Sequence, residues 1–299
     1  MKTVNVYHYD AFSTKPDKGN PAGVVVDGAL LSEAEMQEIA SKVGFNETGF
    51  ITASDKADLR IRYFTPGHEM DLCGHGTIAC LYGLHEHNLL LHKDSFTIET
   101  NAGVLPIKLQ VNDNGRLYIT MKQAAPKFIE FGGSKADLAS ALGLASDDIS
   151  DALPVMYGST GIWTLLIPIN SLAAFKKMKP QNQLFPEVLK EIPKASLHPF
   201  CLETELEHAD MHARHFSSPF SGTVEDPVTG TASGVMGAYY AEFIKKEAVR
   251  PFELVIEQGL EIDRAGKVLV KVSDSENGPD IEIAGTAVYV KSMEISVNQ

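Results

Sequence analysis

Two short segments of this chain combine groups that transfer protons with turns that can bind anions. In the first, residues 224–231, two carboxylates (Glu225 and Asp226) come just before a Gly/Thr-rich turn. Apolar residues at helical spacing follow the turn, so the free amides of a first helical turn are expected around Gly230 and Thr231. These amides suit a small carboxylate held beside an acid or base, for which the segment offers Glu225 and Asp226. The alternative is an ordinary capped helix start.

The second segment repeats the first about 150 residues earlier. It runs through Cys73, Gly74, His75 and Gly76 into another apolar helical pattern. Three pairs of residues align the segments, with separations of 214 − 62 = 152 for Arg62 and Arg214, 219 − 66 = 153 for Pro66 and Pro219, and 230 − 76 = 154 for Gly76 and Gly230. Two single-residue insertions are enough for this alignment, in which Cys73 lies opposite Asp226.

A repeat of this length predicts two copies of one domain folded against each other. We expect an N-terminal half at residues 1–121, completed by a C-terminal strand at 286–299, and a second half at 127–285. Both helix N-termini would then face one cavity between the halves, each with a partial positive charge.

Glu47 is a further candidate for proton transfer. It lies between Phe45 and Phe50 at the turn that leaves a predicted helix. A solvated loop is the usual place for a single glutamate, but the aromatic flanks predict partial burial. Burial raises the pKa of a carboxyl group toward the range useful in acid–base catalysis.

The composition limits the partners. The chain has 299 residues, 44% hydrophobic, and a formal net charge of −13, which disfavours nucleic acid and anionic membranes. No apolar run is long enough to span a bilayer, and the first twelve residues alternate like a strand, so a cytoplasmic location is expected.

Metal and nucleotide cofactors are not expected. The three cysteines form no C-x-x-C pair, which disfavours zinc and a disulfide framework. Residues 74–79 match the dinucleotide pattern G-x-G-x-x-A, but they do not follow a buried apolar strand as that motif requires. Cys73 is a candidate thiolate at a helix N-terminus or, more commonly, a small buried residue.

The elements that must position these residues are mostly strands. Strands are predicted at 4–8, 23–26, 52–64, 96–98, 105–110, 117–121, 163–167 and 200–202, with further strands up to residue 297. Ser32 and Glu35 form a capping box for a helix that ends near Gly44. Further helices are predicted near 172–178 and 231–245, and residues 15–21 and the linker 122–126 as loops.

The order of four motifs resembles the PhzF-like, or phenazine-biosynthesis-like, family. The motifs are Asn20-Pro21-Ala22-Gly23, Phe45-Asn46-Glu47-Thr48, the segment from Phe64 to Cys73-Gly74-His75-Gly76-Thr77, and Glu225-Asp226-Pro227-Val228-Thr229-Gly230-Thr231-Ala232. The resemblance spans nearly the whole chain. It implies an α+β fold of the diaminopimelate epimerase type, with two pseudo-symmetric domains, each a β-barrel-like sheet around a central helix.

The resemblance also implies a function, a cofactor-independent isomerase that moves a proton on a small carboxylate-bearing substrate. Glu47 would shuttle the proton, and Asp226 and His75 would act beside it. Substrate-binding roles are implied for Asn20, Cys73, Gly74, Gly76, Gly230 and Thr231. No metal or other cofactor is expected, and a homodimer is a possible assembly.

Two alternatives stay open. The first is an epimerase of amino or hydroxy acids that uses Cys73 and Asp226. Epimerases of this fold use a cysteine from each half, and here Cys73 aligns with Asp226. A non-catalytic protein that binds small carboxylates is the other. Cys73 also departs from the small residue expected at this position in phenazine-type enzymes, so the substrate is not predicted.

Overall fold

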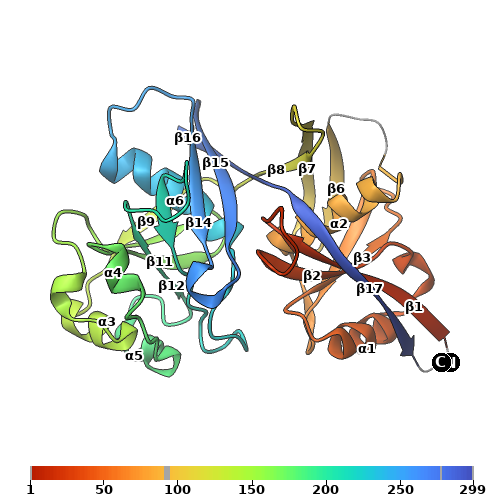
Figure 1. Cartoon of the computed structure of the whole chain (residues 1–299), viewed down its shortest axis with the longest axis horizontal. Helices are drawn as coiled ribbons and strands as arrows, with labels where there is room; N and C mark the ends of the chain where they lie inside the picture. Colours follow the sequence, from red (N-terminus) through yellow and green to blue (C-terminus); the bar gives the residue numbers. More distant parts are fainter. Residues whose placement is uncertain (1, 91–94, 277, 298–299) are drawn as a thin grey trace. The chain divides into compact units, whose positions relative to one another are not determined.

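The computed structural model describes residues 2–90, 95–276 and 278–297. The chain divides into two compact units. Unit 1 comprises Met1–Lys122 and Ala284–Gln299, and unit 2 comprises Gln123–Ile283. Figure 1 shows both, with the C-terminal strand β17 lying beside the N-terminal strand β1 in unit 1. Among the described residues, no helix is both long and apolar enough to cross a membrane.

Unit 1 is a mixed sheet whose strands pair one after another. Their order is β17 (Ala287–Val297), β1 (Lys2–Ala11), β2 (Asn20–Val25), β3 (Thr48–Thr52), β4 (Leu59–Phe64), β6 (Ser95–Thr100), β7 (Gly103–Val111) and β8 (Leu117–Lys122). The pairs β2–β3 and β4–β6 are parallel and the others antiparallel. The two-residue strand β5 (Glu69–Met70) pairs with the end of β4.

Helix α2 (Gly74–Glu86) is the centre of unit 1. Nine of its thirteen residues are buried, and it contacts β1, β2, β3, β4, β8 and β17. The sheet therefore curves around this helix, as the predicted fold class requires. Helix α1 (Glu33–Val43) packs against β3, β4 and β17, and the short 3-10 helix η1 spans Gly28–Leu30.

Unit 2 repeats this arrangement. Its strands are β9 (Lys127–Glu130), β10 (Met156–Ser159), β11 (Trp163–Pro168), β12 (Ser196–Cys201), β13 (Met211–Ala213), β14 (Phe252–Gln258), β15 (Gly266–Ser275) and β16 (Gly278–Gly285). From β9 to β15 the successive pairs are antiparallel, antiparallel, parallel, antiparallel, parallel and antiparallel, the same directions in the same order as from β17 to β7. Helix α6 (Gly230–Tyr239) lies between β13 and β14 in the chain, as α2 lies between β4 and β6.

The remaining elements of unit 2 are short. They are α3 (Lys135–Leu142), α4 (Leu172–Phe175), α5 (Phe185–Val188) and the 3-10 helices η2 (Ser146–Asp148), η3 (Asn182–Leu184) and η5 (Leu260–Ile262). Side chains of α3, α4 and α5 pack on β10, β11 and β12 in one apolar core that includes Leu138, Phe175 and Phe185.

Several predicted boundaries are confirmed and others are wrong. Helix α1 has the predicted capping box and ends at Gly44, which adopts the left-handed conformation. The strand predicted at 52–64 is two strands, because the Ser54 hydroxyl accepts hydrogen bonds from the amides of Lys56 and Ala57 and turns the chain. The helix at 172–178 ends at Phe175, where tighter turns replace it. The helix at 231–245 becomes a π-helix at Tyr240–Ile244, and β2 already begins at Asn20, inside the predicted loop.

The internal repeat is real, but its predicted register is wrong around the helices. Cys73 caps α2 and Thr229 precedes α6 at the same position, so the separation is 229 − 73 = 156. Thr77 donates to the Cys73 carbonyl (2.7 Å) as Ser233 donates to the Thr229 carbonyl (2.9 Å), again 156 apart. The counterpart of Cys73 is therefore Thr229, not Asp226. The alignment failed because the loop at residues 217–224 of unit 2 is four residues longer than its counterpart at 65–68 of unit 1. The alignment allowed only two single-residue insertions.

Candidate active site

Glu47 and His75 meet in unit 1 although 28 residues separate them in the chain. Glu47 directly precedes β3, and its carbonyl accepts a hydrogen bond from the Gly23 amide of the parallel neighbour β2 (3.1 Å). His75 lies in the first turn of α2. Its Nε2 is 3.0 Å from Glu47 Oε2, and the two side chains are 10% and 14% exposed. The sheet and the central helix thus bring the two candidate catalytic residues together.

The contact between His75 and Glu47 is close enough for an ion pair, but its angles do not meet the geometry of a hydrogen bond. Glu47 Oε2 is buried and accepts no hydrogen bond from any described residue. This oxygen therefore has no hydrogen-bond donor among the described residues that a substrate proton would have to displace.

Cys73 and Asn20 complete the surroundings of His75. The Cys73 sulfur is 3.5 Å from His75 Nδ1, and Asn20 Nδ2 is 3.2 Å from the same nitrogen. Both residues are buried. Burial alone would lower the pKa of His75, but the nearby Glu47 carboxylate opposes burial and raises it. Burial raises the pKa of the Cys73 thiol, which disfavours a thiolate nucleophile there.

The start of α2 offers amides beside these side chains. The Gly76 amide donates to Cys73 Sγ (3.3 Å) and the Thr77 amide to the Cys73 carbonyl (2.9 Å). The amides of Gly74 and His75 have no acceptor among the described residues. A Cβ on Gly74 would meet nothing within 4 Å, so open space adjoins this amide pair. An anion fits such a helix terminus.

The substrate-binding role predicted for Gly76 stays a prediction, and the structure shows a packing role for this residue. Its amide is already used by Cys73. A Cβ at this position would lie 3.0 Å from Cys73 Sγ and 3.2 Å from the Tyr63 ring. Gly76 therefore makes room for the buried cysteine and tyrosine.

A metal ion is the other group this cluster could hold. One oxygen of Glu47, the sulfur of Cys73 and one nitrogen of His75 lie within 4.8 Å of one another, a donor set that zinc accepts. The expectation of no metal stays a prediction, tested below.

In unit 2, Asp226 lies in a hydrogen-bonded turn at the start of α6. Its carboxylate accepts from the Thr229 hydroxyl, and its amide donates to the His215 carbonyl (2.9 Å). The Gln258 side chain donates to the Asp226 carbonyl (2.8 Å) and accepts from the Thr229 amide (3.1 Å). These contacts fix the carboxylate against the helix terminus.

Gly230 and Thr231 follow as the first two residues of α6. Gly230 is buried, and the Thr231 carbonyl accepts from the Thr160 hydroxyl (3.2 Å). The turn predicted from the sequence is thus present in unit 2, as its counterpart is in unit 1. That both turns bind one ligand stays a prediction.

Sequence reasoning missed two residues that shape this turn, one within it and one on strand β14. Thr229 is the N-cap residue of α6, as Cys73 is of α2, and a correct alignment of the repeat would have identified it. Gln258 ends strand β14, 32 residues after Asp226, and no local pattern marks it.

Comparison with known proteins agrees with these observations. The family described as PhzC-PhzF, phenazine biosynthesis-like protein, matches residues 9–293. A protein of Bacillus subtilis (strain 168) named "Uncharacterized isomerase YfhB" is 50% identical over 297 residues, covering 99% of this chain and 100% of the relative. The crystal structure of a PhzF-family phenazine biosynthesis protein from Bacillus anthracis has a TM-score of 0.97 and 56% identity, covering 99% of this chain and 100% of that one.

More distant relatives extend the comparison. The trans-2,3-dihydro-3-hydroxyanthranilate isomerase of Pseudomonas aeruginosa is 28% identical over 279 residues, which is 92% of this chain and 93% of that enzyme. A hydroxyproline epimerase from Agrobacterium vitis, 11% identical with a TM-score of 0.63 over 99% of this chain and 93% of that one, shares the fold. The fold is therefore the predicted diaminopimelate epimerase type. With a matching family over almost its full length and relatives named as isomerases, the chain belongs to the phenazine biosynthesis-like (PhzC-PhzF) family and is a PhzF-family isomerase.

Proposed function

We propose that this isomerase moves a proton between two carbons of a small carboxylate-bearing molecule, with Glu47 as the proton-transfer group and no cofactor. One observation carries the proposal: Glu47 Oε2 is buried, accepts no hydrogen bond from a described residue, and lies 3.0 Å from a histidine. A carboxylate oxygen in this position can contact a substrate C–H bond directly, as general acid–base catalysis requires.

In this mechanism Glu47 removes a proton from an acidic C–H bond, and the electron pair moves into the conjugated system of the substrate. The same carboxyl group then returns the proton to another carbon, so atoms and electrons balance within one molecule. His75, whose pKa is raised by the neighbouring Glu47 carboxylate, stabilises the developing negative charge. A doubly protonated His75 donates from Nδ1 to the Asn20 amide oxygen, which requires the amide to be turned so that its oxygen replaces Nδ2.

The substrate carboxylate is proposed to bind at the amides of Gly74 and His75, beside the open space at Gly74. Asn20 and Cys73 line the same cluster. The roles implied by the family resemblance for Asp226, Gly230 and Thr231 stay predictions. A cytoplasmic location, a possible homodimer and the lack of nucleic-acid or membrane partners rest on composition and resemblance alone.

The Pseudomonas aeruginosa relative supplies the first substrate to test, trans-2,3-dihydro-3-hydroxyanthranilate. A panel of other small carboxylates follows it, because the relative is 28% identical. The reaction is run in deuterated water, and deuterium incorporation into substrate and product is measured by NMR.

The decisive variants are Glu47→Gln and Cys73→Ala. Glu47→Gln retains the shape of the side chain but cannot carry the proton, so we expect a rate loss on the order of 10²-fold to 10⁴-fold. Cys73→Ala is the matched comparison in the same cluster, and we expect only a small loss through packing. Exchange that survives in Glu47→Gln and vanishes in Cys73→Ala would replace this mechanism with cysteine-based epimerisation. Binding without exchange in the wild type, across the panel, would favour a carboxylate-binding protein.

The absence of a cofactor is tested separately. Dialysis against EDTA should leave the rate unchanged, and added zinc should inhibit if it occupies Glu47, Cys73 and His75. A rate that falls with EDTA and returns with zinc contradicts the cofactor-free mechanism.

A further inference from the structure

Each unit holds an arginine in a two-pronged ion pair with a glutamate. In unit 1, Arg62 Nε and one terminal nitrogen donate to the two oxygens of Glu69, both at 2.7 Å. The guanidinium lies over the Phe64 ring at 5.1 Å. The two charged side chains are 17% and 20% exposed. This planar geometry, which lysine cannot make, gives strong and directional hydrogen bonds.

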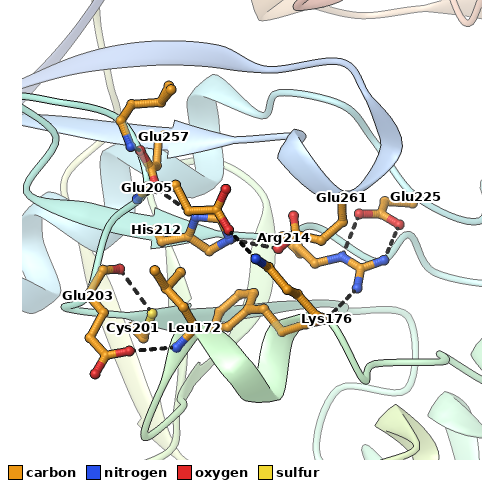
Figure 2. A network of polar contacts seen from close by, with 12 residues as sticks. Leu172, Lys176, Cys201, Glu203, Glu205, His212, Arg214, Glu225, Glu257 and Glu261 are labelled. Atoms are coloured by element: carbon orange, nitrogen blue, oxygen red, sulfur yellow. Dashed lines mark hydrogen bonds and ion pairs between the residues drawn. The ribbon is translucent and has the colours of Figure 1, made fainter.

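Unit 2 has the same arrangement, and Figure 2 shows its ion pair between Arg214 and Glu225. Arg214 donates to both oxygens of Glu225 at 2.8 Å, and the guanidinium lies over the Phe216 ring at 4.7 Å. The remaining terminal nitrogen donates to the Phe175 carbonyl at 3.0 Å. The side chains of this pair are 8% and 11% exposed, so the pair is more buried than its counterpart.

The two arginine–glutamate pairs occupy equivalent positions, although Arg62 also donates to Glu33 at 2.7 Å. The loops that the two pairs close differ in length. Glu69 pairs with Phe64 as Glu225 pairs with Phe216, each in an antiparallel bridge. Between the bridged residues lie four residues in unit 1 (65–68) and eight in unit 2 (217–224). The ion pair and the ring contact have kept their geometry while the loop length changed. That retention indicates a role for the ion pair beyond closing a particular loop.

The position of each pair points to that role. Glu225 directly precedes Asp226, whose amide is bonded to the His215 carbonyl. Glu69 begins the short strand from which the chain enters Cys73 and α2. Each glutamate therefore holds the last residues before the turn that carries the candidate site residues of its own unit.

We propose that Arg62–Glu69 and Arg214–Glu225 are positioning pairs, which fix the turns at Cys73–His75 and at Asp226–Thr229 in the geometry needed for proton transfer. This inference rests on the proposed function of those turns. Neither pair touches the reacting atoms. Loss of one pair loosens its own turn and leaves the turn of the other unit unchanged.

The test uses the full chain with Glu225→Gln and Glu69→Gln. Glutamine keeps the side-chain shape but places an NH₂ group opposite the guanidinium, so one of the two hydrogen bonds is lost. Asp274→Asn is the matched control, because Asp274 pairs with Arg250 at the surface and is 71% exposed. If either glutamine variant fails to fold, Arg214→Lys or Arg62→Lys removes the planar fork while keeping the charge.

Amide hydrogen exchange and the imidazole ¹⁵N shifts of His75 and His215 are measured at one pH. We expect Glu225→Gln to speed exchange about tenfold in peptides spanning 217–231 and to shift the His215 signals, with 65–77 unchanged. Glu69→Gln should affect 65–77 and His75 instead. The Asp274→Asn control should match the wild type.

Two results overturn the proposal. One is that exchange rates and ¹⁵N shifts stay unchanged in both variants. The other is that exchange rises equally throughout the core of a unit, because that is the behaviour of a pair that only stabilises the fold. These readouts need no substrate. They therefore decide the proposal even if the wild type turns over no carboxylate and the proposed function fails. Where a substrate is found, kcat should fall in both variants with little change in KM.

Discussion

At the scale of single residues, Gly74 and Gly76 lie in the same helical turn with different surroundings. Open space adjoins Gly74, whereas Gly76 packs against Cys73 and Tyr63. The Tyr63 hydroxyl is hydrogen-bonded to Thr77, and Cys73 caps the helix, so neither neighbour can move freely. Gly74 is therefore the glycine proposed to adjoin a ligand, and Gly76 serves the packing of the site.

Exchanging each glycine for alanine separates these roles. Gly74→Ala should raise the free energy of unfolding by up to about 1 kcal/mol, because alanine restricts the unfolded chain. It should weaken binding of anthranilate, used as a carboxylate probe, since the methyl group fills the space beside the amides. Gly76→Ala should lower the free energy of unfolding by about 1–2 kcal/mol through overpacking.

Urea denaturation and calorimetric titration of both variants check this prediction. Gly74→Ala with wild-type affinity for a carboxylate that the wild type binds would contradict the proposed anion site. Gly76→Ala with wild-type stability would contradict the packing role.

At the scale of elements, a buried histidine joins strands β13 and β14 to η5. His212 on β13 contacts Glu257 on β14 (2.7 Å) and Glu261 on η5 (2.9 Å), as Figure 2 shows. Glu257 in turn accepts hydrogen bonds from the amides of Glu205 and Leu206 (both 2.7 Å). Burial alone would lower the pKa of His212, but the hydrogen bonds with both glutamates raise it to about 9.

This raised pKa predicts how the stability of unit 2 depends on pH. Because the folded-state pKa exceeds the unfolded value of about 6.5, the stabilisation is fully present below pH 6.5. It is lost as the pH rises through about 9. The loss is on the order of 3 kcal/mol for a shift of this size.

Urea denaturation at pH 6.5, 8 and 9.5 measures the effect. His208→Gln is the control, because that histidine is 85% exposed, and it should retain the wild-type pH dependence. His212→Gln should be less stable at pH 6.5 and show a flatter profile. A wild-type protein equally stable at all three pH values would contradict the prediction.

At the scale of the whole molecule, the chain builds one topology twice but closes unit 1 with a strand from its far end. Strand β17 pairs with β1 along the full length of β1. Val297, Met293 and Ile295 of β17 also pack in the apolar core beneath α1. In unit 2 the equivalent strand, β9, comes before its partner β10 within the same stretch of chain, with α3 and η2 between them.

Truncation after Gly285 should therefore unfold unit 1 and leave unit 2 folded. The truncated chain loses the β1–β17 ladder and part of the core of unit 1, whereas the strands β9–β15 keep their partners. Hydrogen exchange should show fast exchange in residues 2–122 and retained protection in 127–275. A synthetic peptide of residues 286–299, added in excess, should restore protection in unit 1. Full protection of unit 1 without the peptide would contradict this dependence.

Local signals in the sequence determined a large part of this structure. The capping box at Ser32 and the glycine at position 44 predicted both ends of α1. The turns at Cys73 and Thr229 and their helices were visible from residue types alone. These predictions succeeded because capping and turn chemistry act over three or four neighbouring residues and depend little on the rest of the chain.

Other features were decided only by tertiary structure. The register that matches Cys73 with Thr229 depends on which bridge and which helix cap form, and not on the spacing of identical residues. The contact of Glu47 with His75 requires β3 to lie beside the central helix. Gln258 reaches Asp226 only because β14 runs beside β13. Long-range strand pairing and packing bring these groups together. A short window of sequence does not show which distant residue will contact a given side chain.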